Sequence, residues 1–199
     1  MKFTIPNMIS GIRVLIAPVF LLLLLKQDDH SVQIACGLFL IGAVTDYLDG
    51  WYARKYEMVT ALGRFFDPLA DKVLTTAAYL GFVLLGIADL WMLIVIILRD
   101  MITTLLRVYA DSVKQPIVTS FSAKTKTFLQ MVYIIYILIL YFIKSLEKQN
   151  DWAIVANRLL HSDSTYYIML ALTLFTIWTA IDYLYVNKNL LYGIIRNKK

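Results

Sequence analysis

The chain has 199 residues, of which 60% are hydrophobic, and its mean hydropathy is +0.68. Soluble domains usually contain about 45–50% apolar residues, so this composition excludes an ordinary soluble domain and indicates a membrane protein. The net charge is +5. Because the tyrosines lie within apolar runs and not among basic residues, this charge indicates cytoplasmic loops and anionic lipid, with no nucleic acid partner.

The hydrophobic residues occur in long runs without strict alternation, which favours helices over strands. A helix that spans a membrane needs about 20 mostly apolar residues. The segments that meet this requirement are residues 9–25, 32–53, 68–88, 90–110, 125–144 and 165–186. The predicted fold is therefore an all-α integral membrane bundle of six transmembrane helices, built as one domain over residues 1–199.

Two segments outside these runs are a short N-terminal stretch and a predicted outer loop. The stretch Met1–Met8 is expected to lie along the membrane interface as a short juxtamembrane segment. No small-residue cleavage site follows the first run, so we expect an uncleaved first helix and not a signal peptide. Residues 146–163 are expected to form an outer loop of unassigned role.

Lysine and arginine are concentrated in the connections on one predicted side of the membrane, which is expected to be cytoplasmic. They are Arg54, Lys55, Arg64, Lys114, Lys124 and Lys126, with Lys2 and Lys188 near the two ends. The turn Gly86–Asp89, on the other predicted side, has no positive charge. Both termini are therefore predicted to be cytoplasmic.

Four aspartates lie at the predicted cytoplasmic ends of the second and third segments. Asp46 and Asp49 are three residues apart, and Asp67 and Asp71 are four apart. Both spacings place a pair on one helix face. Four facing carboxylates would repel one another strongly unless cations lay between them. Ligand sets made only of oxygen favour magnesium, manganese or calcium over zinc.

Small and basic residues accompany these aspartates. Gly50 leaves room for a ligand near the helix backbone, and Ala53 is also small. Arg54 can bind a phosphate through paired hydrogen bonds. Gly63 opens the approach to the second pair of aspartates. These residues together favour a site for a phosphate-containing ligand beside the metal ions.

Two other interpretations compete with this one. A single intramembrane aspartate can simply pair with a lysine, as Asp71 and its neighbour Lys72 could. The carboxylates could also be the ion site of a cation transporter. A transport path requires polar groups distributed across the membrane, whereas these cluster near one face.

The pattern Asp-x2-Asp-Gly-x2-Ala-Arg-x8-Gly-x3-Asp-x3-Asp, from Asp46 to Asp71, resembles the complete signature of the CDP-alcohol phosphotransferase family. The resemblance implies six transmembrane helices, a homodimer in the cell inner (plasma) membrane and an active site facing the cytoplasm. It implies that the four aspartates bind two divalent cations, Mg²⁺ or Mn²⁺, and that Asp71 is also the general base. It further implies a binding site for the CDP-lipid formed by Gly50, Ala53, Arg54, Thr60, Gly63 and Asn7.

The remaining motifs concern the acceptor alcohol. Three stretches resemble bacterial phosphatidylglycerophosphate synthases: the opening Ile5–Arg13, Arg99 to Arg107, and Lys124 to Thr127 with Gln130. Asp100 departs from the common glutamate, and Ala123 from the glycine that commonly precedes the first lysine. The resemblance therefore implies transfer from CDP-diacylglycerol to glycerol 3-phosphate. Arg99 and Arg107 are about 80° apart around one helix. With Lys124 and Lys126 they are expected to bind the acceptor phosphate.

Other interpretations of these basic residues stay open. Inositol phosphate would also require a basic pocket, and phosphatidylglycerol is another possible acceptor. Lys124 and Lys126 can instead follow only the positive-inside rule. Arg99 could pair with Asp100, but adjacent helix residues are expected to point apart. Asn7 can be a helix cap, and Arg13 an arginine that reaches the interface.

Overall fold

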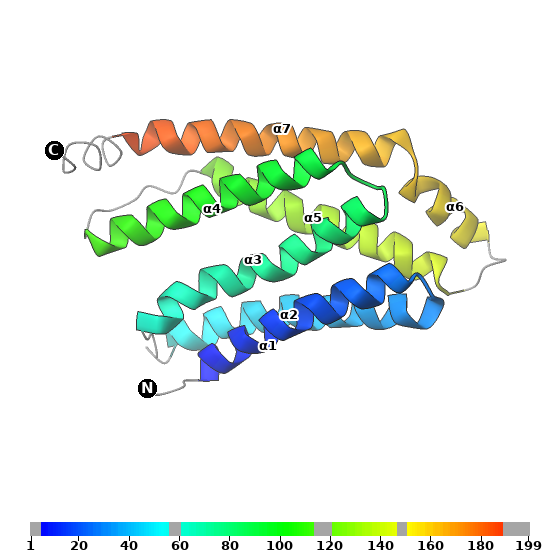
Figure 1. The fold of residues 1–199 in the computed structure, drawn as a ribbon, viewed down its shortest axis with the longest axis horizontal. Helices are drawn as coiled ribbons and strands as arrows, with labels where there is room; N and C mark the ends of the chain where they lie inside the picture. Colours follow the sequence, from blue (N-terminus) through cyan, green and yellow to red (C-terminus); the bar gives the residue numbers. More distant parts are fainter. Residues whose placement is uncertain (1–4, 56–60, 114–120, 147–150, 189–199) are drawn as a thin grey trace.

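The computed structural model describes residues 5–55, 61–113, 121–146 and 151–188, and within these ranges it contains helices and no strands (Figure 1). The helices are α1 (Ile5–Lys26), α2 (Asp29–Lys55), α3 (Ala61–Leu84), α4 (Leu90–Ser112), α5 (Phe121–Lys144), α6 (Asp151–Leu160) and α7 (Asp163–Val186). Each predicted segment coincides with one long helix, so the all-α prediction is confirmed.

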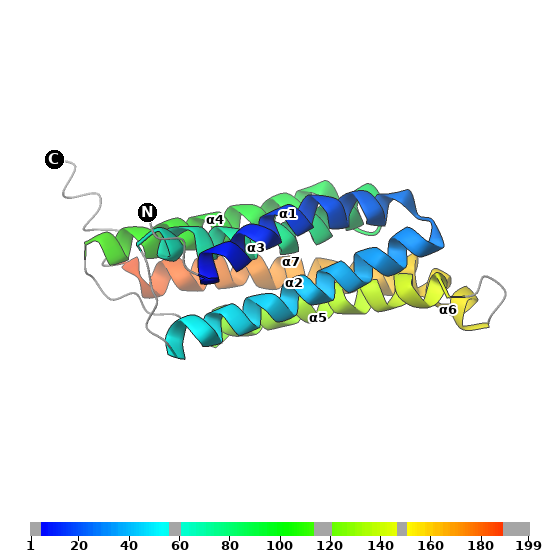
Figure 2. The same cartoon turned by 90° about the horizontal axis from the view of Figure 1, so that it is seen from below.

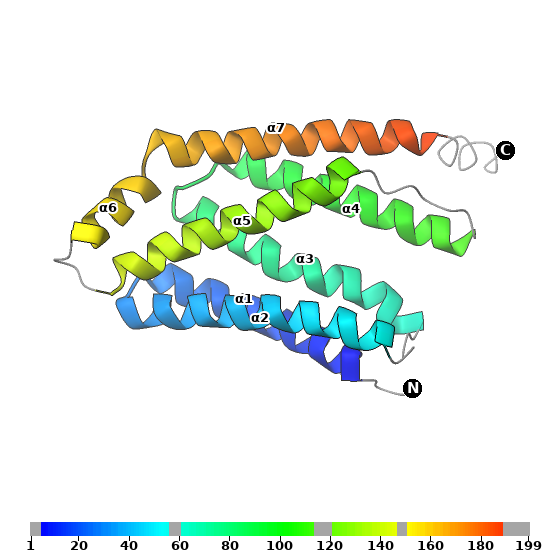
Figure 3. The same ribbon diagram turned by 180° about the vertical axis from the view of Figure 1, so that it is seen from behind.

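The long helices run along a common axis, and consecutive ones alternate in direction (Figures 1 and 3). One end of the bundle contains the start of α1, the end of α2, the start of α3 and the ends of α4 and α7. We call this the aspartate end, because both predicted aspartate pairs are in the helix segments found there. The opposite end contains the α1–α2 and α3–α4 turns and the short helix α6. Both ends of the helical chain therefore lie on the same side of the bundle, as predicted.

The long helices pack around one continuous hydrophobic core, with α7 between the two outer groups in Figure 2. Seen from below, α1, α3 and α4 lie along one side and α2 and α5 along the other (Figure 2). Helix α1 packs against both α2 and α3, while α4 and α5 each pack against α7. Aromatic side chains fill the space between α3 and α5, where the Tyr79 and Tyr133 rings stack and Phe82 meets both edge-on. These contacts bring α5 beside the aspartate-bearing helix α3.

Local backbone chemistry explains the two tight turns at the opposite end. Gln27 adopts a left-handed conformation with φ 55°, and the Asp28 carboxylate then accepts a hydrogen bond from the Ser31 backbone N–H at 2.9 Å. That bond caps the start of α2. Gly86 ends α3 with φ 75°, a conformation that costs glycine little. Short turns of this kind make neighbouring helices antiparallel.

The outward surface of the bundle is strongly apolar. Many large hydrophobic side chains are exposed, including Leu15 (70%) and Ile181 (63%). A soluble protein rarely exposes so much contiguous apolar surface. Among the described residues, α5 and α7 are long and apolar enough to cross a membrane. The structure is thus consistent with a helical membrane protein.

Three expectations at the ends of the chain and of the bundle require correction. Helix α1 begins at Ile5, so residues 5–8 belong to the first long helix and not to a separate interfacial segment. Pro6 suits this first turn because its missing N–H needs no partner there. Arg13 is buried, which excludes an arginine reaching toward the interface.

The third correction concerns the predicted outer loop, because residues 151–160 form α6. Its buried residues Ala153, Ala156 and Leu160 share one face against the bundle, while Trp152 is exposed. At 10 residues, this helix is too short to span a membrane, so hydrophobic length does not reveal it in the sequence. Asp151 in its first turn and Arg158 in its last complement the helix dipole.

Candidate active site

The four predicted metal ligands lie on two helix segments at the same end of the bundle. Asp46 and Asp49 are in the last three turns of α2, and Asp67 and Asp71 are in the first three turns of α3. Both segments are at the aspartate end (Figure 1). The structure describes only the backbone of these four residues. The same holds for Asn7, Gly50, Ala53, Arg54 and Gly63, while Thr60 lies outside the described residues altogether.

The donor chemistry of this segment fits hard divalent cations. Four carboxylates supply only oxygen ligands, which is the set that Mg²⁺ and Mn²⁺ prefer. Pairs spaced three and four residues apart on helical backbone lie on one helix face each. The backbone is therefore compatible with the predicted metal site, whose coordination stays a prediction.

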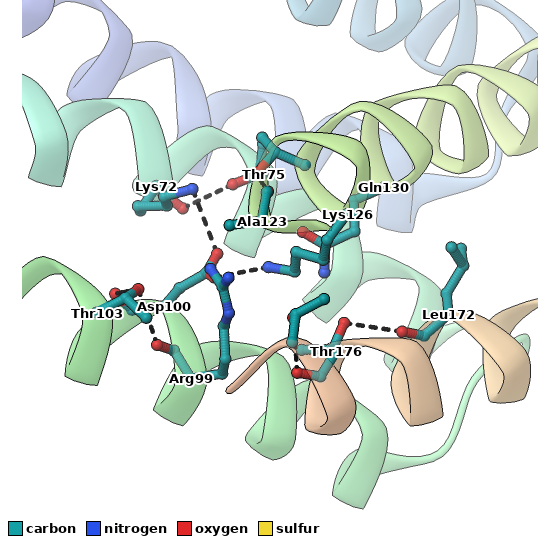
Figure 4. A network of polar contacts seen from close by, with 12 residues as sticks. Lys72, Thr75, Arg99, Asp100, Thr103, Ala123, Lys126, Gln130, Leu172 and Thr176 are labelled. Atoms are coloured by element: carbon teal, nitrogen blue, oxygen red, sulfur yellow. Dashed lines mark hydrogen bonds and ion pairs between the residues drawn. The ribbon is translucent and has the colours of Figure 1, made fainter. Parts of the chain in front are cut away.

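A buried polar cluster lies between α3, α4 and α5, and Asp100 is at its centre (Figure 4). Lys126 of α5 donates to Asp100 Oδ1 at 2.6 Å, and Arg99 Nη1 donates to the same oxygen at 3.2 Å. Lys72 of α3 approaches Asp100 Oδ2 at 3.3 Å. Three cations from three helices thus share one carboxylate.

The cluster is well shielded from solvent. Lys126 is completely buried, and Arg99 and Asp100 are each 8% exposed. Thr103 donates to the Arg99 and Asp100 carbonyls, which holds its own side chain against the helix. Burying charge is costly unless each charge is paired, so these ion pairs constrain how the three helices pack.

The expectation that Arg99 and Asp100 point apart is wrong. Adjacent residues do leave a helix in different directions, but the arginine side chain is long enough to turn back toward its neighbour. Burial removes water as the competing partner, and Asp100 is the nearby acid. The resulting contact between Arg99 Nη1 and Asp100 Oδ1 is the 3.2 Å ion pair.

Among the contacts that the structure describes, positive charge and hydrogen-bond donors exceed the acceptors in this cluster. One carboxylate, Asp100, faces Lys72, Arg99 and Lys126. Within the described part of the chain, Arg99 Nε and Nη2 and Gln130 Nε2 are buried without a hydrogen-bond partner. Buried donors are normally satisfied, so this arrangement suits an anion or another acceptor that enters from outside the protein.

The cluster borders a cavity of about 100 Å³ between α3, α4 and α5. Its polar boundary includes Lys72, Asp100 and Gln130, and most of its remaining lining is apolar. Met101 and Leu105 line it too and are exposed on the outer surface of α4. The cavity therefore borders Lys72 and Asp100 of the cluster, whereas Arg99 and Lys126 do not line it.

The four residues predicted to bind the acceptor phosphate differ in burial. Arg99 and Lys126 meet at Asp100, whereas Arg107 and Lys124 are exposed. Elsewhere in the bundle, Asp182 of α7 accepts a hydrogen bond from Ser122 of α5 at 2.6 Å. Only half of the predicted basic set therefore forms one buried group.

Two members of the cluster were not predicted as functional residues. From the sequence, Asp100 was interpreted as a departure from a common glutamate and as a disfavoured partner of Arg99, and Lys72 as a possible partner of Asp71. In the structure the described contact of Lys72 is to Asp100. The sequence does contain a sign of their importance. Lys72 and Asp100 are charged residues within predicted membrane spans, where an unpaired charge costs free energy, so both are expected to have partners.

Comparison with known proteins identifies related sequences. The profile of the family described as CDP-alcohol phosphatidyltransferase matches residues 3–178. The Bacillus subtilis CDP-diacylglycerol–glycerol-3-phosphate 3-phosphatidyltransferase is 36% identical over 142 residues, covering 65% of this chain and 74% of the relative. The protein of the same name from Rickettsia typhi is 35% identical over 127 residues, covering 64% and 71%. That from Mycoplasma genitalium is 35% identical over 156 residues, covering 77% and 63%.

Proposed function

The chain belongs to the CDP-alcohol phosphatidyltransferase family, and we propose from this premise that it transfers a phosphatidyl group from CDP-diacylglycerol to glycerol 3-phosphate. The products are phosphatidylglycerophosphate and CMP, so the enzyme is a transferase of phospholipid biosynthesis. The observation that carries this proposal is the similarity over most of the chain to relatives named for that reaction. The buried cationic cluster supports an anionic acceptor.

The proposed reaction is one displacement at phosphorus. The acceptor hydroxyl attacks the β-phosphorus of CDP-diacylglycerol and forms a new P–O bond. The P–O bond to the bridging oxygen breaks, and that oxygen leaves with CMP. Asp71 takes the hydroxyl proton as general base, for which its carboxylate must lie within hydrogen-bond distance of the acceptor. Positioning and electrostatic stabilisation then provide most of the rate enhancement.

Asp46, Asp49, Asp67 and Asp71 are proposed to hold two divalent cations, Mg²⁺ or Mn²⁺. These ions would neutralise charge on the pyrophosphate and on the departing CMP. The placement of both aspartate-bearing segments at one end of the bundle supports this assignment. The CDP moiety is proposed to bind beside the metal ions, at Asn7, Gly50, Ala53, Arg54, Thr60 and Gly63.

The acceptor phosphate is proposed to bind where basic residues of α4 and α5 approach one another. Arg99 has two buried nitrogen atoms without a partner in the described structure, so it is the strongest candidate for a direct contact. Lys126 is paired with Asp100 and contributes positive charge to the same region. The exposed residues Arg107 and Lys124 are proposed to attract the anionic acceptor on its approach.

The number of spanning helices, the membrane and the orientation of the bundle are part of the same proposal. We place all six long helices across the inner (plasma) membrane, with the aspartate end in the cytoplasm. Two apolar helices, the apolar outer surface and the common side of both chain ends support this arrangement. The family resemblance further suggests a homodimer.

An acceptor screen tests the proposed function. Purified protein in detergent with CDP-diacylglycerol and Mg²⁺ is given glycerol 3-phosphate, inositol phosphate, phosphatidylglycerol or serine, and CMP release is measured. We expect release with glycerol 3-phosphate. Release only with another alcohol would show that the acceptor is wrong, and ion flux without lipid turnover would support a transporter.

A further inference from the structure

Asp100 has a position that the proposed binding and catalytic roles do not explain. Both of its carboxylate oxygens are occupied by cations. Oδ1 accepts from Arg99 and Lys126, and Oδ2 lies 3.3 Å from Lys72 Nζ. Lys72 belongs to α3 and Lys126 to α5, whereas Arg99 lies beside Asp100 on α4.

The first two contacts fix the acceptor side. Arginine and lysine have flexible side chains, and holding them in one geometry before the substrate arrives reduces the entropy lost on binding. Asp100 holds Arg99 through Nη1 alone, which leaves Nε and Nη2 buried without partners within the described structure. The guanidinium is therefore fixed in place, and two of its nitrogen atoms have no hydrogen-bond partner within the described structure.

The third contact reaches the metal-bearing helix. Lys72 follows Asp71, the proposed general base, directly in α3. The ion pair between Lys72 and Asp100 therefore joins α3 to α4 one residue from the proposed reacting group. A shift of about 1 Å between two reacting groups can reduce an enzymatic rate about 100-fold, so such a link has catalytic value.

We propose that Asp100 is a positioning residue that fixes Arg99 and Lys126 for an anionic acceptor and, through Lys72, sets their distance from Asp71. This inference rests on the proposed function, because it assumes an acceptor with a phosphate group. It predicts that Asp100 acts on the acceptor and not on the CDP-lipid. A carboxylate that only stabilises the fold would affect both substrates alike.

The test compares Asp100→Asn, Asp100→Glu and Asp89→Asn with the wild-type protein in steady-state assays that vary each substrate separately. Asp89 is the matched control, because it also accepts hydrogen bonds, from Trp91 and Tyr166, but lies in the turn at the opposite end. We expect Asp100→Asn to raise the KM for glycerol 3-phosphate about tenfold or more, with less than about a twofold change for CDP-diacylglycerol. Asp100→Glu should restore most of the loss, and Asp89→Asn should match wild type.

Equal changes in both KM values, or no change in either, would overturn the proposal. If Asp100→Asn does not fold, Lys72→Met provides the same comparison, because Lys72 is partly exposed and Asp100 keeps its other partners. It should raise the acceptor KM about threefold and leave the lipid KM unchanged. If the wild-type protein uses only another acceptor, the proposed function is wrong, and the comparison with that acceptor tests Asp100. If it transfers to no acceptor, both proposals are wrong.

Discussion

Replacing Lys126 by methionine and Asp100 by asparagine should destabilise the protein to different extents. Lys126→Met removes one buried cation, whose Nζ lies 2.6 Å from Asp100 Oδ1. Asp100 then keeps Lys72 and Arg99, so the loss is one charge-assisted hydrogen bond, about 1–3 kcal/mol. Asp100→Asn instead leaves three cations without their shared acid. Breaking a buried pair in this way typically costs about 3–5 kcal/mol, because the remaining charge is uncompensated.

The free energy of unfolding in detergent, measured by denaturant titration, compares the two variants and their combination. The double variant should be more stable than the sum of the single effects predicts, because removing Lys126 relieves part of the excess positive charge left by Asp100→Asn. Lys124→Met is the matched control, since Lys124 is exposed two residues away in the same helix. If Lys126→Met lowered the free energy of unfolding as much as Asp100→Asn, or if the two effects were strictly additive, Asp100 would not be the common partner of the three cations.

Four further predictions concern the reaction and the packing. Asp71→Asn should abolish CMP release while leaving the unfolding transition unchanged, because it removes the proposed base and one proposed metal ligand. Arg107→Ala should raise the KM for glycerol 3-phosphate more than that for CDP-diacylglycerol, in the same two-substrate assay. Chelation of divalent cations should abolish CMP release, and added Mg²⁺ or Mn²⁺ should restore it. Gly81→Ala should destabilise the fold by about 1–3 kcal/mol through overpacking, because its Cβ would lie 2.9 Å from Leu24 Cδ2, and denaturant titration measures this loss.

Each of these predictions has its own control or contradicting outcome. Near-normal activity of Asp71→Asn would remove the general-base assignment. An equal effect of Arg107→Ala on both substrates would argue against a role at the acceptor. Activity that survives complete chelation would contradict the metal site. Gly37→Ala is the control for the packing prediction, because nothing lies within 4 Å of the added Cβ, and helix propensity should then stabilise it by about 0.5–1 kcal/mol.

The sequence predicted the long helices well because hydrophobic length determines them directly. Five of the six expected segments lie within α1, α2, α4, α5 and α7, and the sixth, residues 68–88, overlaps α3 but continues past its end at Leu84. The sequence did not predict α6, because this helix has 10 residues and buries Ala153, Ala156 and Leu160, so it lacks the long apolar run that identifies a membrane-spanning helix. The start of α1 was misplaced for a related reason. Pro6 and Asn7 lower the mean hydropathy of its first turn, although Pro6 is compatible with a helix at that position. Length and hydropathy thus identify spans better than they identify the helices that flank them.

The candidate site was predictable where spacing along one helix carries the information. The aspartate pairs and the residues that follow them form a continuous motif, and the family match is consistent with it. The Asp100 cluster depends instead on contacts among Lys72, Arg99 and Lys126 across three helices. Such contacts depend on how the helices pack, which the sequence pattern does not specify. For that reason Arg99 and Lys126 were predicted to bind the acceptor phosphate, whereas the pairing of Arg99 with Asp100 was disfavoured and that of Lys126 with Asp100 was not predicted.

A dual-label assay tests the central claim most directly. Purified protein receives CDP-diacylglycerol labelled with ¹⁴C in its acyl chains and glycerol 3-phosphate labelled with ³³P, and the lipid products are separated. Phosphatidyl transfer predicts one new lipid that carries both labels at the mass of phosphatidylglycerophosphate, with one CMP released for each molecule formed. CMP release without ³³P in any lipid would contradict the proposed function.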